Sequence, residues 1–406
     1  MAVVLILLSK NELKTVLKTQ AENSIILLIL FQGGDFLSGV YIHIPFCKSK
    51  CPYCDFHSQR CNSSVQENYV DAIIDEITTL RRTKHLLTDL KFTAGTLYLG
   101  GGTPSVLTPQ QLEKIILTAK GKFNIPDDSE ITVECNPSSD IESLIPVFKS
   151  CGVNRISLGM QSAVDAERKL LGRISDRKRV KAVIDLLKAN GIENISLDIM
   201  LGVPNQTKES LSETLDFIKE CSAKHISAYI LKIEEGTFFD THKERFSFPS
   251  DDEACDLYEH CSDYLESNGF SHYEISNFAI PDFESKHNTK YWTLEDYLGI
   301  GAAAHSFVNG KRFYFESDTQ GFIDGNEAIF DCDGHTAEEY IMLRLRLKNG
   351  LNLSSLTSIY GEKYGQKIIK KAPFLAEKGL AKFDGKTLSL TRKGYLLSNS
   401  IISELI

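Results

Sequence analysis

The sequence of 406 residues lacks an apolar run long enough to cross a membrane. Its two apolar runs, residues 2–8 and 24–31, are short and are separated by charged side chains, whereas a spanning helix needs about 20 apolar residues. No basic segment precedes the first run, so a secretory signal peptide is not indicated. We expect residues 1–38 to be either a short helix and strand that cover the domain or a segment outside the native protein, with translation starting near Leu37.

A cationic surface is also missing. The chain has 45 Lys and Arg against 54 Asp and Glu, a formal net charge of −9. A nucleic-acid-binding protein normally presents a basic face. We therefore expect no nucleic acid among the partners, and a tRNA-modifying enzyme is disfavoured. Internal repeats and low-complexity tracts are absent as well, and the length suggests two or three globular domains.

Apolar strand patterns alternate with helical patterns from Val40 to about residue 235. This repetition of strand, crossover and strand predicts an α/β fold with a parallel sheet and helices outside it. Functional side chains then belong at the C-terminal ends of the strands. The predicted strands are residues 40–46, 96–102, 130–136, 155–160, 194–201 and 225–233.

The rhythm of strands and helices breaks after residue 235. A helix is predicted over 251–268, a loop-rich region through 335, and then helices with a hairpin that turns at Asp384-Gly385. Helices with a terminal hairpin resemble a small winged-helix module. The expected units are an N-terminal extension (1–38), a core (39–235), a covering region (236–335) and a C-terminal winged-helix-like domain (336–406).

Three of the ten cysteines, Cys47, Cys51 and Cys54, form the pattern C-x3-C-x2-C. The others are scattered, as expected of isolated thiols in a reducing cytosol, which predicts a cytoplasmic protein. Clustered thiolates need a metal to neutralise them. A structural zinc site needs a fourth ligand, for which His57 or Cys61 is available. A [4Fe–4S] cluster normally takes four cysteines, so three would leave one iron open.

This cysteine pattern, at the end of a first strand and before an aromatic residue, resembles the radical S-adenosylmethionine (SAM) enzymes. The stretch YIHIPFC (41–47) resembles the oxygen-independent coproporphyrinogen III oxidase family within them. The resemblance implies a partial (β/α)6 barrel with a small α+β winged-helix-like C-terminal domain. It also implies a [4Fe–4S] cluster on Cys47, Cys51 and Cys54, with SAM on the open iron.

Polar residues at the ends of successive predicted strands match the SAM contacts of that superfamily. In GGTP (101–104), consecutive glycines allow the backbone to approach a ligand closely. A carboxylate can accept hydrogen bonds from ribose hydroxyls, and an arginine fork can pair with the carboxylate of SAM. The resemblance assigns SAM to Tyr41, Phe56, Gly101, Gly102, Thr103, Glu134, Gln161, Arg173 and Asp198.

Two features separate the branches of the family. The oxidases carry a further cysteine where this chain has Phe56, and HNTKYW (287–292) fits the HNxxYW pattern of the HemW branch, which is implicated in heme binding. Neutral imidazole suits iron, and aromatic rings can stack on a flat macrocycle. The resemblance therefore implies heme at His287, Asn288, Tyr291 and Trp292, with His305 and His272 as secondary ligand candidates.

Two functions follow from the resemblance. The first is a heme chaperone that binds a [4Fe–4S] cluster, SAM and heme and passes heme to an acceptor protein. The alternative is an oxygen-independent coproporphyrinogen III oxidase, which decarboxylates two propionates in porphyrin biosynthesis. No catalytic side chain is assigned. The expected partners are heme and a heme acceptor, and a homodimer is compatible with the sequence.

Overall fold

The structure is a computed structural model that describes residues 39–87 and 93–406, so the predicted N-terminal extension lies outside the described residues. Strands β1 to β6 pair side by side in chain order, and every neighbouring pair is parallel. The six-strand prediction is therefore confirmed. The strands are β1 (Gly39–Ile44), β2 (Thr96–Gly101), β3 (Glu130–Cys135), β4 (Arg155–Gln161), β5 (Asn194–Leu201) and β6 (His225–Ile230).

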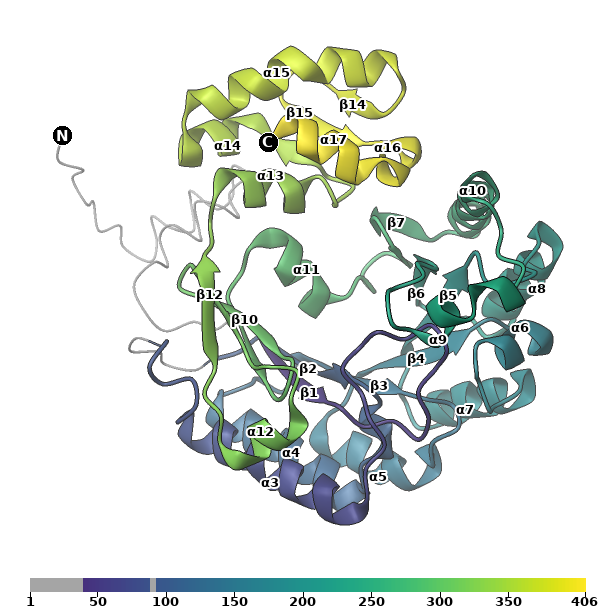
Figure 1. Cartoon of the computed structure of the whole chain (residues 1–406), viewed down its shortest axis with the longest axis vertical. Coiled ribbons are helices and arrows are strands. Elements are labelled where there is room, and N and C mark those ends of the chain that lie inside the picture. The colour runs from purple at the N-terminus through teal and green to yellow at the C-terminus, as the bar shows by residue number, and fades with distance from the viewer. Residues whose placement is uncertain (1–38, 88–92) are drawn as a thin grey trace.

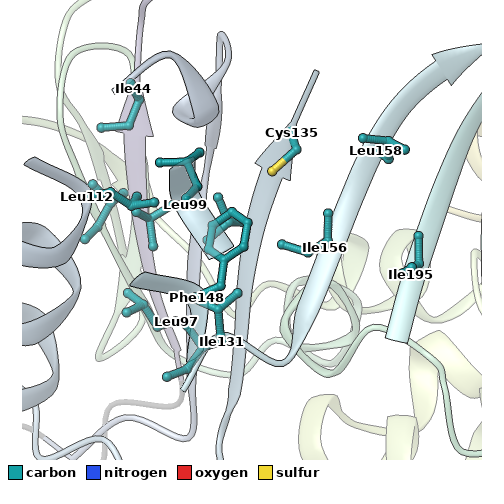
Figure 2. Close-up of a cluster of buried hydrophobic side chains, with 14 of the residues drawn as sticks. Ile44, Leu97, Leu99, Leu112, Ile131, Cys135, Phe148, Ile156, Leu158 and Ile195 are labelled. Atoms are coloured by element: carbon teal, nitrogen blue, oxygen red, sulfur yellow. The ribbon is translucent and has the colours of Figure 1, made fainter. Parts of the chain in front are cut away.

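Helices cover the outer, convex face of this curved sheet (Figure 1). All of them except α6 begin at a side-chain cap, as in α4, where Thr108 and Gln111 form a reciprocal capping box. The apolar faces of these helices pack on strands that are buried on both sides, which Figure 2 shows around Leu99, Ile131 and Phe148. The helices are α3 (Ser63–Thr79), α4 (Pro109–Lys122), α5 (Ile141–Cys151), α6 (Asp165–Leu170), α7 (Arg177–Ala189) and α8 (Lys208–Glu220).

Shorter strands extend both edges of the parallel sheet. Strand β9 (Tyr297–Ile300) pairs with β1, followed by β10 (His305–Val308), β11 (Lys311–Tyr314) and β12 (Ile329–Asp333). On the opposite edge, β8 (Asn277–Ala279) and β7 (Ser271–Glu274) follow β6.

The region expected to be loop-rich therefore contains ordered elements. Its strands have only three to five residues, too few for a recognisable alternation. Its helices are α11 (Lys286–Thr293) and α12 (Thr319–Asp324). Before it lie α9 (Phe238–Thr241) and α10 (Asp251–Ser267), and α10 confirms the helix predicted over 251–268. Helix α11 lies between the barrel and the C-terminal domain (Figure 1).

The C-terminal region has a core of its own, to which Leu294 and Phe307 of the preceding region contribute. The predicted hairpin is present: Gly385 has a φ of +87°, and the Asp384 carboxylate accepts hydrogen bonds from the backbone N–H groups of Lys386 and Thr387. The elements are α13 (Ala337–Arg344), β13 (Leu351–Asn352), α14 (Leu353–Tyr360), α15 (Glu362–Glu377), β14 (Ala381–Phe383), β15 (Thr387–Leu390), α16 (Arg392–Leu396) and α17 (Ser398–Leu405).

Helices long and apolar enough to cross a membrane do not occur within residues 39–87 and 93–406.

Candidate functional site

The three clustered cysteines lie on the loop that follows β1, at the C-terminal edge of the parallel sheet. Their thiols are free and partly buried, and all three line one cavity of about 810 Å³. The loop is held in place by backbone hydrogen bonds, from Cys47 N–H to the Gln59 carbonyl (3.0 Å) and from Cys54 N–H to the Cys51 carbonyl (3.1 Å). The cavity below this loop is called the core cavity.

The donor arrangement bears on the choice between zinc and an iron–sulfur cluster. In the described part of the chain, no three His, Cys, Asp or Glu side chains converge closely enough to hold one metal ion. The two residues considered as a fourth zinc ligand, His57 and Cys61, do not line the core cavity. A cube-shaped cluster needs less convergence, because each cysteine binds a different iron atom. The loop therefore fits a cluster better than a single ion.

The residues that the sequence assigns to SAM come from β1, β3, β5, the ends of β2 and β4 and three loops, and all nine of them line the core cavity. Parallel strands produce this convergence, because their C-terminal ends meet at one edge of the sheet. Gly101 has a φ of +110°, and a Cβ there would lie 2.5 Å from the His43 ring. A Cβ on Gly172 would lie 2.8 Å from Pro52, so the turn before Arg173 packs directly on the cysteine loop.

Two of the residues assigned to SAM are carboxylates that face the core cavity. Glu134 accepts hydrogen bonds from the Tyr98 hydroxyl (2.7 Å) and the Gly101 N–H (3.1 Å). Burial raises the pKa of Glu134 to about 7, although the hydrogen bond from Tyr98 opposes the shift. Asp198 accepts a hydrogen bond from the Ser157 hydroxyl (3.1 Å), and burial raises its pKa as well. A cation entering the cavity would favour the ionised form of both groups.

Arg173 contributes a positive charge on the same side as the cysteines. Its guanidinium donates a hydrogen bond to the Gly159 carbonyl and has one Nη atom 3.6 Å from the Cys51 Sγ atom. A fixed guanidinium next to the thiol loop can bind a carboxylate through its planar fork.

His287 lies on α11 and does not line the core cavity, unlike Asn288, Tyr291 and Trp292 of the same motif. It is 1% exposed, and both ring nitrogens are engaged at 2.8 Å, one with the Thr96 hydroxyl and one with the Tyr291 hydroxyl. Burial lowers its pKa to about 3, so the ring is neutral. An iron ligand would have to give up one of these hydrogen bonds.

A second cavity of about 670 Å³ adjoins the first, since the two share Tyr41, Phe56, Gly101, Glu134, Tyr291 and Trp292. We call it the outer cavity. His305 lines it, stacks on Tyr314 with ring centroids 5.3 Å apart, and has no hydrogen-bond partner for its ring among the described residues. His272 lines neither cavity, because it is buried against Phe278.

Sequence reasoning missed several residues that line the core cavity. Tyr53, Tyr98, Glu274, Asn277 and Arg346 all face it. Glu274 and Asn277 belong to the short strands β7 and β8, and Arg346 follows α13, in a part of the chain where no strand rhythm marks the end of a strand. A hydrophilic residue inside a strand, such as Glu274 in SHYE, is the one available signal.

These elements define a radical SAM protein. Residues 41–218 match the Radical SAM superfamily, and residues 335–397 match the HemN C-terminal domain. The solved structure of coproporphyrinogen III oxidase (HemN) from Escherichia coli superposes with a TM-score of 0.76 over 95% of this chain and 93% of that chain. At 21% identity this similarity establishes the fold, as expected from the sequence.

Sequence comparison identifies the family within that fold. Heme chaperone HemW of Lactococcus lactis subsp. lactis is 32% identical over 91% of this chain and 97% of its own length. Heme chaperone HemW of Bacillus subtilis is 34% identical over 90% of this chain and 98% of its own. The chain therefore belongs to the HemW family.

Proposed function

We propose that this protein is a heme chaperone that holds a [4Fe–4S] cluster and SAM in the core cavity, binds heme beside them and passes it to an acceptor protein. The observation that carries the proposal is the pair of adjoining cavities. One is lined by the cysteine loop and the strand ends, and the other is lined mainly by aromatic and aliphatic side chains. Membership of the HemW family supports the same assignment.

In the core cavity, Cys47, Cys51 and Cys54 would hold the cluster. Such a cluster supplies one-electron chemistry at the sulfonium of SAM. Gly101 and Gly102 let the backbone approach the amino group of SAM, and the other assigned residues orient the rest of the molecule.

The polar groups of the cavity would bind different parts of SAM. Arg173 would bind the carboxylate of SAM, and Glu134 would accept from its ribose hydroxyls. Glu134 would bind them best when ionised. Phe56, 65% exposed at the junction of the two cavities, would cover the adenine and limit the access of water.

In the outer cavity, His305 is the imidazole best placed to bind heme iron. Its ring is accessible and its nitrogens are uncommitted, whereas the ring of His287 is enclosed by Thr96 and Tyr291. Tyr291 and Trp292 would then contact the macrocycle, and His287 would position Tyr291.

The test uses anaerobically reconstituted full-length protein. With SAM, a reductant and coproporphyrinogen III, we expect no vinyl product by liquid chromatography. Formation of that product would replace the chaperone with the oxidase. In parallel, heme is titrated into the wild type, His287→Ala, His305→Ala and the control His85→Ala, whose exposed ring lines neither cavity.

We expect His305→Ala to shift the Soret band and weaken heme binding, and His85→Ala to match the wild type. A wild type that binds no heme would overturn the chaperone. A His305→Ala variant with an unchanged spectrum would remove His305 from the iron.

A further inference from the structure

One side of the core cavity is built from residues after position 235. Glu274 ends β7, Asn277 begins β8, Trp292 lies on α11, and Arg346 follows α13. The segment that carries Arg346 is fixed to the barrel edge by backbone hydrogen bonds, from Ile275 N–H to the Arg346 carbonyl (3.0 Å) and from the N–H of residue 348 to the carbonyl of residue 273 (3.0 Å). These four side chains therefore belong to an ordered wall.

Each of these side chains has a buried polar atom without a hydrogen-bond partner among the described residues: Glu274 Oε2, Asn277 Oδ1, Trp292 Nε1 and Arg346 Nε. Glu274 and Asn277 are 1% and 4% exposed. Buried polar atoms are nearly always paired, because leaving one unpaired costs free energy. Two of the four atoms, Trp292 Nε1 and Arg346 Nε, are donors, so a ligand with acceptor atoms would pair with this part of the wall, whereas Glu274 Oε2 and Asn277 Oδ1 are acceptors that such a ligand would not pair with.

The donors of this wall select an anion. Arg346 forms no salt bridge in the described part of the chain, although its charge acts on the neighbouring Glu274. Its guanidinium carbon lies 4.4 Å from the centroid of the Trp292 ring, and this stacking holds the planar fork in place. A cation and an indole N–H side by side suit a carboxylate, which accepts from both. The carboxylate of Glu274 would repel the carboxylate of a ligand, so the ligand group would lie on the Arg346 side of the wall.

We propose that Arg346 and the Trp292 indole N–H form a subsite for a carboxylate side chain of the tetrapyrrole ligand. The identity of that ligand rests on the proposed function. Trp292 lines both cavities, so a macrocycle against its ring in the outer cavity can extend its carboxylate edge toward Arg346. Burial raises the pKa of Glu274, which reduces the repulsion between that group and the ligand.

The test compares heme with heme dimethyl ester, in which both carboxylates are blocked. Each is titrated by absorbance into the wild type, Arg346→Gln, Trp292→Phe and the control Arg344→Gln. Arg344 is a close neighbour on α13 that stacks on Tyr340 and does not line either cavity. Circular dichroism and iron content of the reconstituted proteins show whether each variant is folded.

Because hydrogen bonds to charged groups are the strong ones, we expect esterification to weaken wild-type binding by roughly 10- to 100-fold. Arg346→Gln should bind heme about as weakly as the wild type binds the ester, and should no longer distinguish the two. Trp292→Phe should bind heme with an affinity a few-fold lower than the wild type, as expected for the loss of a neutral hydrogen bond. Arg344→Gln should behave as wild type.

Equal binding of heme and ester by the wild type would overturn the subsite and leave the chaperone standing. So would an Arg346→Gln variant that distinguishes them as well as the wild type does. Should Arg346→Gln fail to fold, an unchanged affinity in Trp292→Phe together with no ester effect in the wild type would overturn the subsite. A wild type that binds neither compound would overturn the proposed function itself.

Discussion

Replacing His287 by Ala should destabilise the protein even when no heme is present. The substitution leaves the Thr96 hydroxyl, 1% exposed, without its 2.8 Å partner and also removes the hydrogen bond to Tyr291. An unpaired buried group costs about 1–3 kcal/mol. The more accessible Tyr291 hydroxyl adds about 1 kcal/mol, and the lost packing of the ring on Tyr98 adds roughly 1 kcal/mol. We expect a loss of about 3–5 kcal/mol in the free energy of unfolding.

The pH dependence provides an independent measure. Burial holds the pKa of His287 at about 3 in the folded protein, whereas an exposed histidine in the unfolded chain has a pKa of about 6.5. Acid therefore favours the unfolded state, which binds the proton at a higher pH. The contribution of the neutral His287 ring to the free energy of unfolding is complete above pH 6.5 and is lost as the pH falls toward 3. At pH 5, which is 1.5 below the unfolded pKa, about 2 kcal/mol of that contribution is lost. The Ala variant should lack that part of the acid sensitivity.

The assay is denaturant unfolding of iron-free, heme-free protein followed by circular dichroism at pH 8 and pH 5. His85→Ala serves as the matched control, because an exposed substitution should change stability by less than about 0.5 kcal/mol. If His287→Ala unfolds at the wild-type denaturant concentration while heme binding is lost, the reasoning is refuted. His287 would then be an iron ligand, as the motif first suggested.

Three further predictions concern the core cavity. Glu134→Gln should remove about 2.5 kcal/mol of stabilisation that the wild type gains between pH 8 and pH 5, because a carboxyl with its pKa raised to about 7 takes up a proton on folding in that range. Denaturant unfolding at the two pH values measures the difference, and identical pH dependence in the variant and the wild type would contradict it. Cys54→Ala should lose most of its iron after reconstitution while keeping its circular dichroism spectrum, whereas Cys255→Ala, which lines neither cavity, should keep its iron. Gly101→Ala should lower the free energy of unfolding by at least about 2 kcal/mol, because the φ of +110° and the adjacent imidazole both oppose a Cβ. The control Gly121→Ala, on the open surface of α4, should leave the free energy of unfolding unchanged or raise it slightly.

The parallel core could be predicted because its signals are local and strong. Strands β1 to β6 are six to eight residues long, are mostly apolar and are buried on both faces, so each stands out from the amphipathic helices between them. The parallel pairing followed from the alternation of strands with helical crossovers. The short strands β7 to β12 carry no such pattern, because their pairing depends on partners brought from elsewhere in the chain.

The candidate site also has a part that the sequence predicts and a part that depends on tertiary packing. The sequence shows directly the spacing of Cys47, Cys51 and Cys54 and the polar residues at the ends of the predicted strands. One rule of sheet geometry is enough to place them together. The imidazoles are different, because the use of a ring depends on what surrounds it. Tertiary packing encloses His287 between Thr96 and Tyr291 and leaves His305 accessible in the outer cavity.

By itself, then, the sequence determined the parallel barrel, the cysteine loop and the family, because each depends on residue type and on short spacings along the chain. Only the tertiary structure decided which histidine is enclosed, that two cavities adjoin at Trp292, and that Arg346 and Glu274 face the core cavity. Those properties arise from contacts between segments far apart in the sequence, where burial and hydrogen bonding settle what each side chain can do.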